Sequence, residues 1–207
     1  DIVRGKDSTA VKVTYRFPQT DARWDITYKV YSNGVIKVNN HFVAENAQAP
    51  MIPRVGLRMQ LPARITSLAY YGRGPEENYR DRRTSQFFGE YTSDIKDMYE
   101  PYVRPQENNH RTDIYWCTLT SKAKEGLLFV ADRTFEMNVS NYPLESLDSG
   151  DSIENGAPRT AKTNHRHLTD PQAVPSVDFF IDYRMMGIGG DNSWGALAHE
   201  PYLIYCG

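Results

Sequence analysis

Strict alternation of apolar and polar residues is the feature that most constrains this chain. Apolar side chains stand at every second position from 11 to 17, and the same pattern recurs at 24–30 and 55–61. Successive side chains of a strand point to opposite faces of a sheet, so this spacing predicts half-buried β-strands. Asn33-Gly34 follows the second run, and this dipeptide is typical of a tight β-hairpin turn.

Shorter β-rich runs continue along the chain, at 65–71, 114–119, 127–131, 135–140, 177–183 and 202–206. Helical spacing is confined to a short turn near residues 144–147. Many short strands separated by turn signals favour an all-β fold, an antiparallel sandwich. Residues 1–8 show no strand pattern, so we expect an unstructured start followed by one β-domain over residues 9–207.

Charge and composition exclude several classes of protein. The 207 residues carry 24 Lys and Arg against 26 Asp and Glu, a net charge of −2, so no basic excess is available to hold a nucleic acid. No apolar run reaches the roughly 18 residues of a membrane span, and we expect no membrane partner. Cys117 and Cys206 are too few for a disulfide framework or a four-cysteine zinc site, which leaves one bridge between them open.

Residues 72–111 and 141–159 lack the alternation of apolar and polar residues that marks the strands. The first stretch is dense in glycine, proline, carboxylates and arginines. This composition suits either a loop held rigid by Arg–carboxylate pairs or a loop shaped to build a polar pocket. We expect an ordered loop without regular structure, whose carboxylates pair with its arginines: Arg73, Arg82, Arg104 and Arg111.

Carboxylates of the same loop are the obvious candidates for hydrolytic chemistry: Glu76, Glu77, Asp81 and Glu107. A retaining glycosidase needs two carboxyl groups about 5–5.5 Å apart, one of which acts as an acid and has a raised pKa. Each loop carboxylate is flanked instead by arginine or by proline and asparagine, and such neighbours lower a carboxyl pKa and suit ion pairing. The sequence therefore predicts no catalytic residue in this chain.

Residues 186–195 form a glycine-rich motif, Met-Gly-Ile-Gly-Gly-Asp-Asn-Ser-Trp-Gly. A dinucleotide-binding loop would need a strand before it and a helix after it, and no helical pattern follows here. The glycines permit a sharp turn that presents Trp194 at a loop tip, but a core tryptophan beside a glycine turn fits the residues equally well. We expect Asp191 and Asn192 to fix this loop through short side chains that bond nearby backbone.

His165 and His167 stand two residues apart, so on a strand their side chains face the same way. Such a pair can hold a metal ion, but no third ligand stands at a suitable spacing and Arg166 lies between them. We therefore expect a hydrogen-bonded structural pair and no metal site. Three further histidines are isolated in the sequence and receive no role: His41, His110 and His199.

Four motifs follow one another along the chain: residues 72–79 with Asp81-Arg82, residues 101–108 with Arg111, residues 164–168, and residues 186–195. In order and rough spacing they resemble the C-terminal domain of the large bacterial β-galactosidases of glycoside hydrolase family 2, which is also called the small-chain domain. The resemblance extends from about Val11 to the end of the chain.

The resemblance implies a large antiparallel β-sandwich of the supersandwich, galactose-mutarotase-like type. It is expected to be truncated on its N-terminal side, because the family's domain starts further upstream. The parent chain is expected to carry its catalytic glutamates on a TIM barrel, with any Mg²⁺ or Na⁺ on that barrel and no cofactor in this domain. The resemblance also implies that Trp194 contacts the galactoside, that Asp191 and Asn192 lie beside it, and that the full-length enzyme is a homo-oligomer.

On this basis we expect the C-terminal domain of a retaining β-galactosidase that hydrolyses terminal β-D-galactosides. The domain would complete the active site and support assembly, and it would be inactive alone. The alternative is a stand-alone carbohydrate-binding or aldose-mutarotase-like sandwich, in which His165 or His167 acts with Glu107 around an anomeric carbon. A third interpretation is a structural sandwich that only mediates oligomer contacts.

Overall fold

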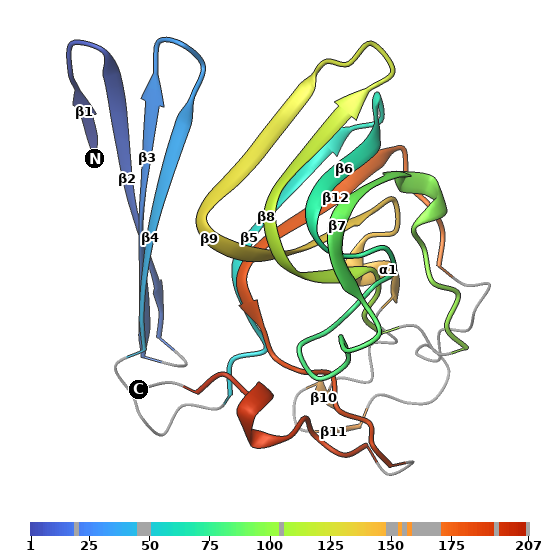
Figure 1. The fold of residues 1–207 in the computed structure, drawn as a ribbon. Coiled ribbons are helices and arrows are strands. Elements are labelled where there is room, and N and C mark those ends of the chain that lie inside the picture. The colour runs from blue at the N-terminus through green and yellow to red at the C-terminus, as the bar shows by residue number, and fades with distance from the viewer. Residues whose placement is uncertain are drawn as a thin grey trace. The chain divides into compact units, whose positions relative to one another are not determined.

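The computed structural model describes residues 1–18, 21–44, 51–103, 106–147, 153–154, 157–158, 171–192 and 195–205. Within these residues the regular structure is almost entirely β-strand (Figure 1). The chain divides into two compact units, Asp1–Ile52 with Leu203–Gly207 and Pro53–Tyr202, and each contains its own antiparallel sheet. The predicted all-β, antiparallel fold class is confirmed.

The sheet of the first unit is a four-stranded meander of β1 (Ile2–Arg4), β2 (Ser8–Phe17), β3 (Ala22–Tyr31) and β4 (Ile36–Ala44). β1 lies within residues 1–8, where we expected no strand. It pairs with β2, with Ile2 opposite Val11. All three β1 side chains are exposed, so no apolar alternation marks this strand in the sequence.

The hairpin between β3 and β4 turns at Asn33-Gly34, as predicted. The Gly34 N–H donates to the Tyr31 carbonyl (3.1 Å), and the Tyr31 N–H donates to the Val35 carbonyl (2.9 Å). Of the Asn-Gly pair only Gly34 has a positive φ, +88°, a conformation that a side chain would strain. The connection is therefore a three-residue loop that ends in a left-handed glycine.

The second unit holds a six-stranded antiparallel sheet in the order β5-β12-β9-β8-β6-β7. Its strands are β5 (Arg54–Pro62), β6 (Ile65–Gly74), β7 (Phe87–Asp94), β8 (His110–Ser121), β9 (Gly126–Ser140) and β12 (Ser176–Met185). The shorter elements are η1 (Ile95–Asp97), α1 (Leu144–Leu147), β10 (Ile153–Glu154), β11 (Ala157–Pro158) and η2 (Glu200–Tyr202). No helix in the described part of the chain is long and apolar enough to cross a membrane.

Three expectations about secondary structure need correction. The runs at 127–131 and 135–140 belong to one long strand, β9. The stretch 72–111 is not without regular structure, because it contains β7, which pairs with β6 along its whole length. The strand expected at 202–206 is not found among its described residues, because the Tyr202 N–H donates locally to the His199 carbonyl (2.9 Å) and forms η2 instead. The helical turn predicted near 144–147 is present as α1.

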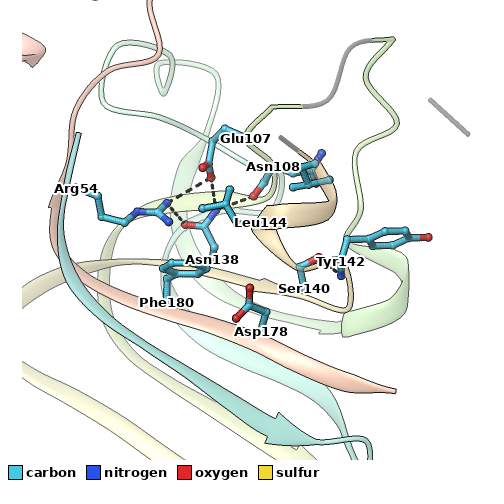
Figure 2. Close-up of a pocket in the computed structure, with 10 residues that line it drawn as sticks. Arg54, Glu107, Asn108, Asn138, Ser140, Tyr142, Leu144, Asp178 and Phe180 are labelled. Atoms are coloured by element: carbon cyan, nitrogen blue, oxygen red, sulfur yellow. Dashed lines mark hydrogen bonds and ion pairs between the residues drawn. The ribbon is translucent and has the colours of Figure 1, made fainter. Parts of the chain in front are cut away.

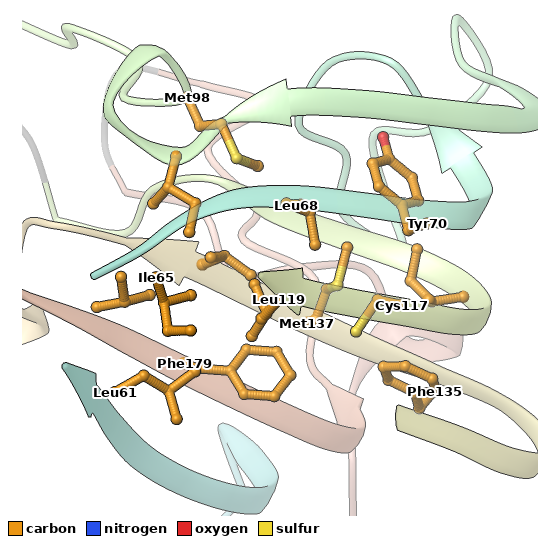
Figure 3. Packing of buried hydrophobic residues seen from close by; sticks show 14 residues of the cluster. Leu61, Ile65, Leu68, Tyr70, Met98, Cys117, Leu119, Phe135, Met137 and Phe179 are labelled. Atoms are coloured by element: carbon orange, nitrogen blue, oxygen red, sulfur yellow. The ribbon is translucent and has the colours of Figure 1, made fainter. Parts of the chain in front are cut away.

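One face of the six-stranded sheet carries the hydrophobic core (Figure 3). Leu68 and Tyr70 on β6, Leu119 on β8, Met137 on β9 and Phe179 on β12 are fully buried. These side chains project from the same face because alternate strand residues point the same way. Burial of each large apolar side chain contributes about 1.5–3 kcal/mol, so the packing of this face stabilises the sheet.

Cys117 belongs to the same core and is a free, buried thiol. Burial raises the pKa of this thiol, because the thiolate would lose its hydration. Cys117 is therefore a small apolar packing residue. The other cysteine, Cys206, lies outside the described residues.

Replacement of a core leucine should test the importance of this face. Leu119→Ala should lower the free energy of unfolding by about 2–5 kcal/mol, because Leu119 has no exposed surface and the change leaves a cavity. Urea unfolding followed by tyrosine and tryptophan fluorescence would measure the loss. Leu128→Ala is the matched control on β9, where the side chain is 63% exposed, and should change stability by less than about 0.5 kcal/mol. Equal losses in the two variants would contradict this assignment of the core.

Candidate functional site

The face of the sheet opposite the hydrophobic core carries a buried polar network. On β9, Phe135, Met137 and Val139 face the core, so the residues between them, Glu136 and Asn138, face the other way. Neighbouring strands add further buried groups to the same face, His110 on β8 and Asp182 on β12. Buried polar groups are stable only when they are paired, and the partners of each group define the site.

His110 lies at the centre of the network and is fully buried. Its Nδ1 lies 2.8 Å from Asn138 Oδ1, and its Nε2 lies 3.1 Å from Glu136 Oε2. Both ring nitrogens therefore have a side-chain partner within hydrogen-bond distance. The ring also stacks on Tyr79, with centroids 5.4 Å apart and planes 21° apart.

Glu136 accepts hydrogen bonds from several donors of the network. It accepts hydrogen bonds from Arg80 Nη1 (3.0 Å) and from the Met185 N–H (2.7 Å), besides its contact with His110. Burial on its own raises the pKa of Glu136, but the hydrogen bond and charge of His110, the Met185 amide and the Arg80 charge outweigh burial and hold the pKa below its usual value. Glu136 is therefore an anion that ties three segments of the chain together.

Asp182 is the least hydrated carboxylate of the network, with 1% of the residue exposed. Arg54 Nε lies 3.1 Å from Asp182 Oδ2. Burial raises the pKa of Asp182 to about 7, and the charge of Arg54 offsets only part of that effect. Opposite it on β5 stands Gly56, where a Cβ would lie 1.9 Å from Asp182 Oδ1, so the carboxylate fills the space that a side chain would need.

A pocket opens beside this network (Figure 2). Arg54 Nη2 donates to Asn138 Oδ1 (2.7 Å) and lies 3.4 Å from Glu107 Oε1, while Asn138 Nδ2 donates to Glu107 (2.5 Å). The Arg54 guanidinium also lies over the Phe180 ring, 4.3 Å from its centroid. In the pocket wall Asp178 accepts two hydrogen bonds from Arg58, both 2.8 Å. The charged groups of the pocket are therefore paired with one another, as in structural ion pairs.

The glycine-rich motif forms a loop held by a carboxylate from the 72–111 stretch. Asp81 Oδ1 accepts the Ile188 N–H (3.2 Å), and Asp81 Oδ2 accepts the Gly189 N–H (2.8 Å). The Gly190 N–H donates to the Ala196 carbonyl (2.8 Å), which joins the two described arms of the loop. We refer to residues 186–199 as the glycine loop, and the structure describes 186–192 and 195–199 of it.

Of the predicted sugar-site residues, Asp191 and Asn192 lie in the described part of this loop. Asp191 and Asn192 are exposed. The Asp191 carboxylate pairs with His199 Nε2 across the loop, a histidine to which the sequence assigned no role. Trp194 lies outside the described residues, as do His165 and His167. Among the residues that are described, no group of three or more His, Cys, Asp or Glu side chains could hold a metal ion.

The expected pairing of the loop arginines is only partly correct. Arg73 Nε lies 2.9 Å from Asp113, just beyond the loop, and Arg82 lies 4.0 Å from Glu77. Arg111 bonds neutral acceptors instead, including the Pro75 carbonyl (3.0 Å) and the Tyr70 hydroxyl (3.2 Å). Arg104 lies outside the described residues. The stretch is thus held by buried amides and aromatic groups as well as by ion pairs.

Sequence reasoning missed His110 and Arg54, which connect the network. A signal was present in β9, where Glu136, Asn138 and Ser140 alternate with three apolar residues. That pattern indicates a strand with a polar, partnered second face. No periodic signal identifies the partners, because they come from other strands and from irregular loops.

Comparison with known proteins gives a consistent result. The family model described as "Beta galactosidase small chain" matches residues 2–207. The chain is 32% identical over 199 residues to the Beta-galactosidase of Priestia megaterium (strain DSM 319 / IMG 1521), 30% over 202 residues to that of Streptococcus thermophilus, and 32% over 200 residues to that of Lactobacillus delbrueckii subsp. bulgaricus. Each alignment covers 96% of this chain but spans only 18% of the relative.

The raised pKa of Asp182 predicts a specific pH dependence of stability. Between about pH 4 and pH 7 the folded protein keeps a proton on Asp182 that the unfolded chain has lost, so the free energy of unfolding should fall as pH rises through this window. Asp182→Asn cannot titrate and should remove about 2–4 kcal/mol of that fall. Urea unfolding of both proteins across the window would measure it. Asp97→Asn, at an exposed carboxylate, is the control, and an Asp182→Asn profile parallel to the original would contradict the assignment.

Proposed function

The chain belongs to the β-galactosidase small-chain family, and we propose that it is the C-terminal domain of a β-galactosidase that hydrolyses terminal β-D-galactosides. The observation that carries the proposal is the pair of coverages in the alignments. The match includes nearly all of this chain but less than a fifth of each named β-galactosidase. A domain of a larger glycosidase explains both numbers.

We further propose that the catalytic carboxylates belong to another part of the parent chain, a TIM barrel. The acid of a retaining glycosidase must keep its proton and touch the glycosidic oxygen. Asp182 has a suitably raised pKa, but with 1% of its surface exposed it cannot reach a sugar. Glu107 is committed to Arg54 and Asn138, and Glu136 to His110 and Arg80. These contacts support a structural use of the carboxylates in this domain.

The role proposed for this domain is to complete the galactoside site with the glycine loop and to support assembly of a homo-oligomer. Trp194 supplies a flat apolar ring for the C–H face of a pyranose, and Asp191 and Asn192 stand beside it in the sequence. The exposed positions of Asp191 and Asn192 support a loop tip that faces outward. Any Mg²⁺ or Na⁺ of the parent enzyme is assigned to the barrel, and no cofactor is assigned to this domain.

If the catalytic carboxylates lie outside this domain, hydrolysis of a β-galactoside should require the full-length polypeptide. The isolated chain should not hydrolyse 2-nitrophenyl β-D-galactoside above the buffer rate, whereas the full-length polypeptide should. Release of 2-nitrophenol at equal molar concentrations would compare the two. Turnover by the isolated chain that disappears on Glu107→Gln or Glu76→Gln would contradict the proposal, since it would place a catalytic carboxylate in this domain.

Removal of the indole should weaken substrate binding in the full-length enzyme. Contact with a pyranose face buries roughly 50–100 Å² of apolar surface, which corresponds to about 1–2.5 kcal/mol. Trp194→Ala should therefore raise KM by about 5–70-fold with a smaller effect on kcat, because the acid and nucleophile are untouched. Steady-state kinetics would test this expectation, with Trp24→Phe as a control. An unchanged KM in Trp194→Ala would reject the sugar contact.

A further inference from the structure

We propose that Asp81 is the positioning residue of the glycine loop, and that it transmits the rigidity of the buried His110–Glu136 network to the galactoside site of the parent enzyme. The inference rests on the proposed function for its kinetic consequence. Its structural part, the fixing of the loop by Asp81, stands on contacts within the described residues alone. The two parts are therefore separable by experiment.

The contact itself joins two segments that are 107–108 residues apart in the chain. Each oxygen of the Asp81 carboxylate accepts one of two consecutive backbone N–H groups, from Ile188 and Gly189. Consecutive amides that converge on one anion form a concave site of positive potential, and a bond to a charged acceptor is stronger than a neutral one. The Asp81 carboxylate thus fixes both the position and the orientation of this part of the backbone.

The loop is shaped to fit this carboxylate closely. A Cβ at Gly187 would lie 2.6 Å from the Asp81 carboxyl carbon and 2.9 Å from Ala198 Cβ. Gly189 has φ +63°, and a Cβ there would lie 2.4 Å from the Ala196 carbonyl oxygen. Glycine at both positions is therefore required by close approach, and not merely by flexibility. The two arms of the loop and Asp81 pack against each other without room for a side chain.

Asp81 is itself held rigidly by the residues on either side of it. The backbones of Tyr79 and Arg82 form two reciprocal hydrogen bonds of 3.1 and 2.8 Å, which make a tight turn with Asp81 inside it. Tyr79 is 2% exposed and stacks on His110, and Arg80 donates to Glu136. Because Tyr79 and Arg80 are both anchored in the buried network, Asp81 cannot move without disturbing it.

These contacts connect two motifs that the sequence presents separately. The Asn-Tyr-Arg-Asp-Arg segment at 78–82 is joined to the glycine-rich segment at 186–195 by the two hydrogen bonds that Asp81 accepts. The first segment inserts Tyr79 and Arg80 into the network and directs Asp81 to the Ile188 and Gly189 amides. The second continues from the Ile188 and Gly189 backbone that Asp81 holds to the exposed Asp191.

The test uses the full-length enzyme and the variant Asp81→Asn, which keeps the shape but replaces one acceptor oxygen by an N–H donor. Hydrogen–deuterium exchange of peptides from 186–199 should become about tenfold faster, the factor expected for the loss of one charge-assisted hydrogen bond. KM for 2-nitrophenyl β-D-galactoside should rise by about tenfold, with kcat within about twofold of the original. Asp97→Asn, on an exposed carboxylate, should change neither quantity.

Each outcome decides one part of the proposal. Unchanged exchange in 186–199 would overturn the fixing of the loop, whatever the kinetics. Faster exchange with an unchanged KM would overturn the link to the galactoside site. The proposed function is tested separately by Trp194→Ala, and its failure would leave the exchange result interpretable.

A second variant keeps the proposal testable if Asp81→Asn does not fold. Gly187→Ala places a methyl group against the Asp81 carboxylate and should accelerate exchange in the same peptides. Combined with Asp81→Ala, which makes room for that methyl group, Gly187→Ala should cause less additional acceleration than it does alone. Additive effects of the two changes would overturn the direct contact.

Discussion

The stack of Tyr79 on His110, with Glu136 and Asn138 bonded to the imidazole nitrogens, is the contact on which the organisation of this domain depends. A fully buried histidine between two acceptors is costly unless every polar group around it is paired. Arg80 donates a hydrogen bond to Glu136, and Arg54 donates one to Asn138, so both partners of the histidine are themselves paired. The loop between β6 and β7 and the strands β5, β8 and β9 are thereby held in one arrangement, and the position of the glycine loop follows from it.

The two faces of β9 show how one strand serves both stability and site geometry. Its core face supplies dispersion and hydrophobic contacts that do not depend on direction, whereas its polar face supplies hydrogen bonds that do. The polar face therefore fixes the positions of irregular segments, which lack the backbone hydrogen-bond ladder of a β-sheet. Asn138 on this face, for example, donates to the Glu107 carboxylate and to the Asn108 carbonyl, which holds that part of the 72–111 stretch.

Much of the fold could be predicted from the sequence, because alternation is a local signal. Ten-residue strands such as β2 and β3 follow directly from it, and the Asn33-Gly34 hairpin from turn chemistry. β1 could not be predicted, since its side chains are exposed and only backbone pairing defines it. Four motifs, among them 72–79 and 186–195, carried the resemblance to the family. Their contact through Asp81 depends on close approach between irregular segments, for which no periodic pattern exists.

Gly56 has a consequence for how the sheet assembles. It is the single residue of β5 without a Cβ, and it stands opposite Asp182, where a Cβ would lie 2.7 Å from the Asp182 Cα. Any sliding of β5 along β12 would bring a side chain into that position and break the pairing. The two strands come from distant parts of the chain, and such pairings form slowly during folding. Steric exclusion at Gly56 therefore restricts the register of β5 on β12, because a shifted alignment would place a side chain against Asp182.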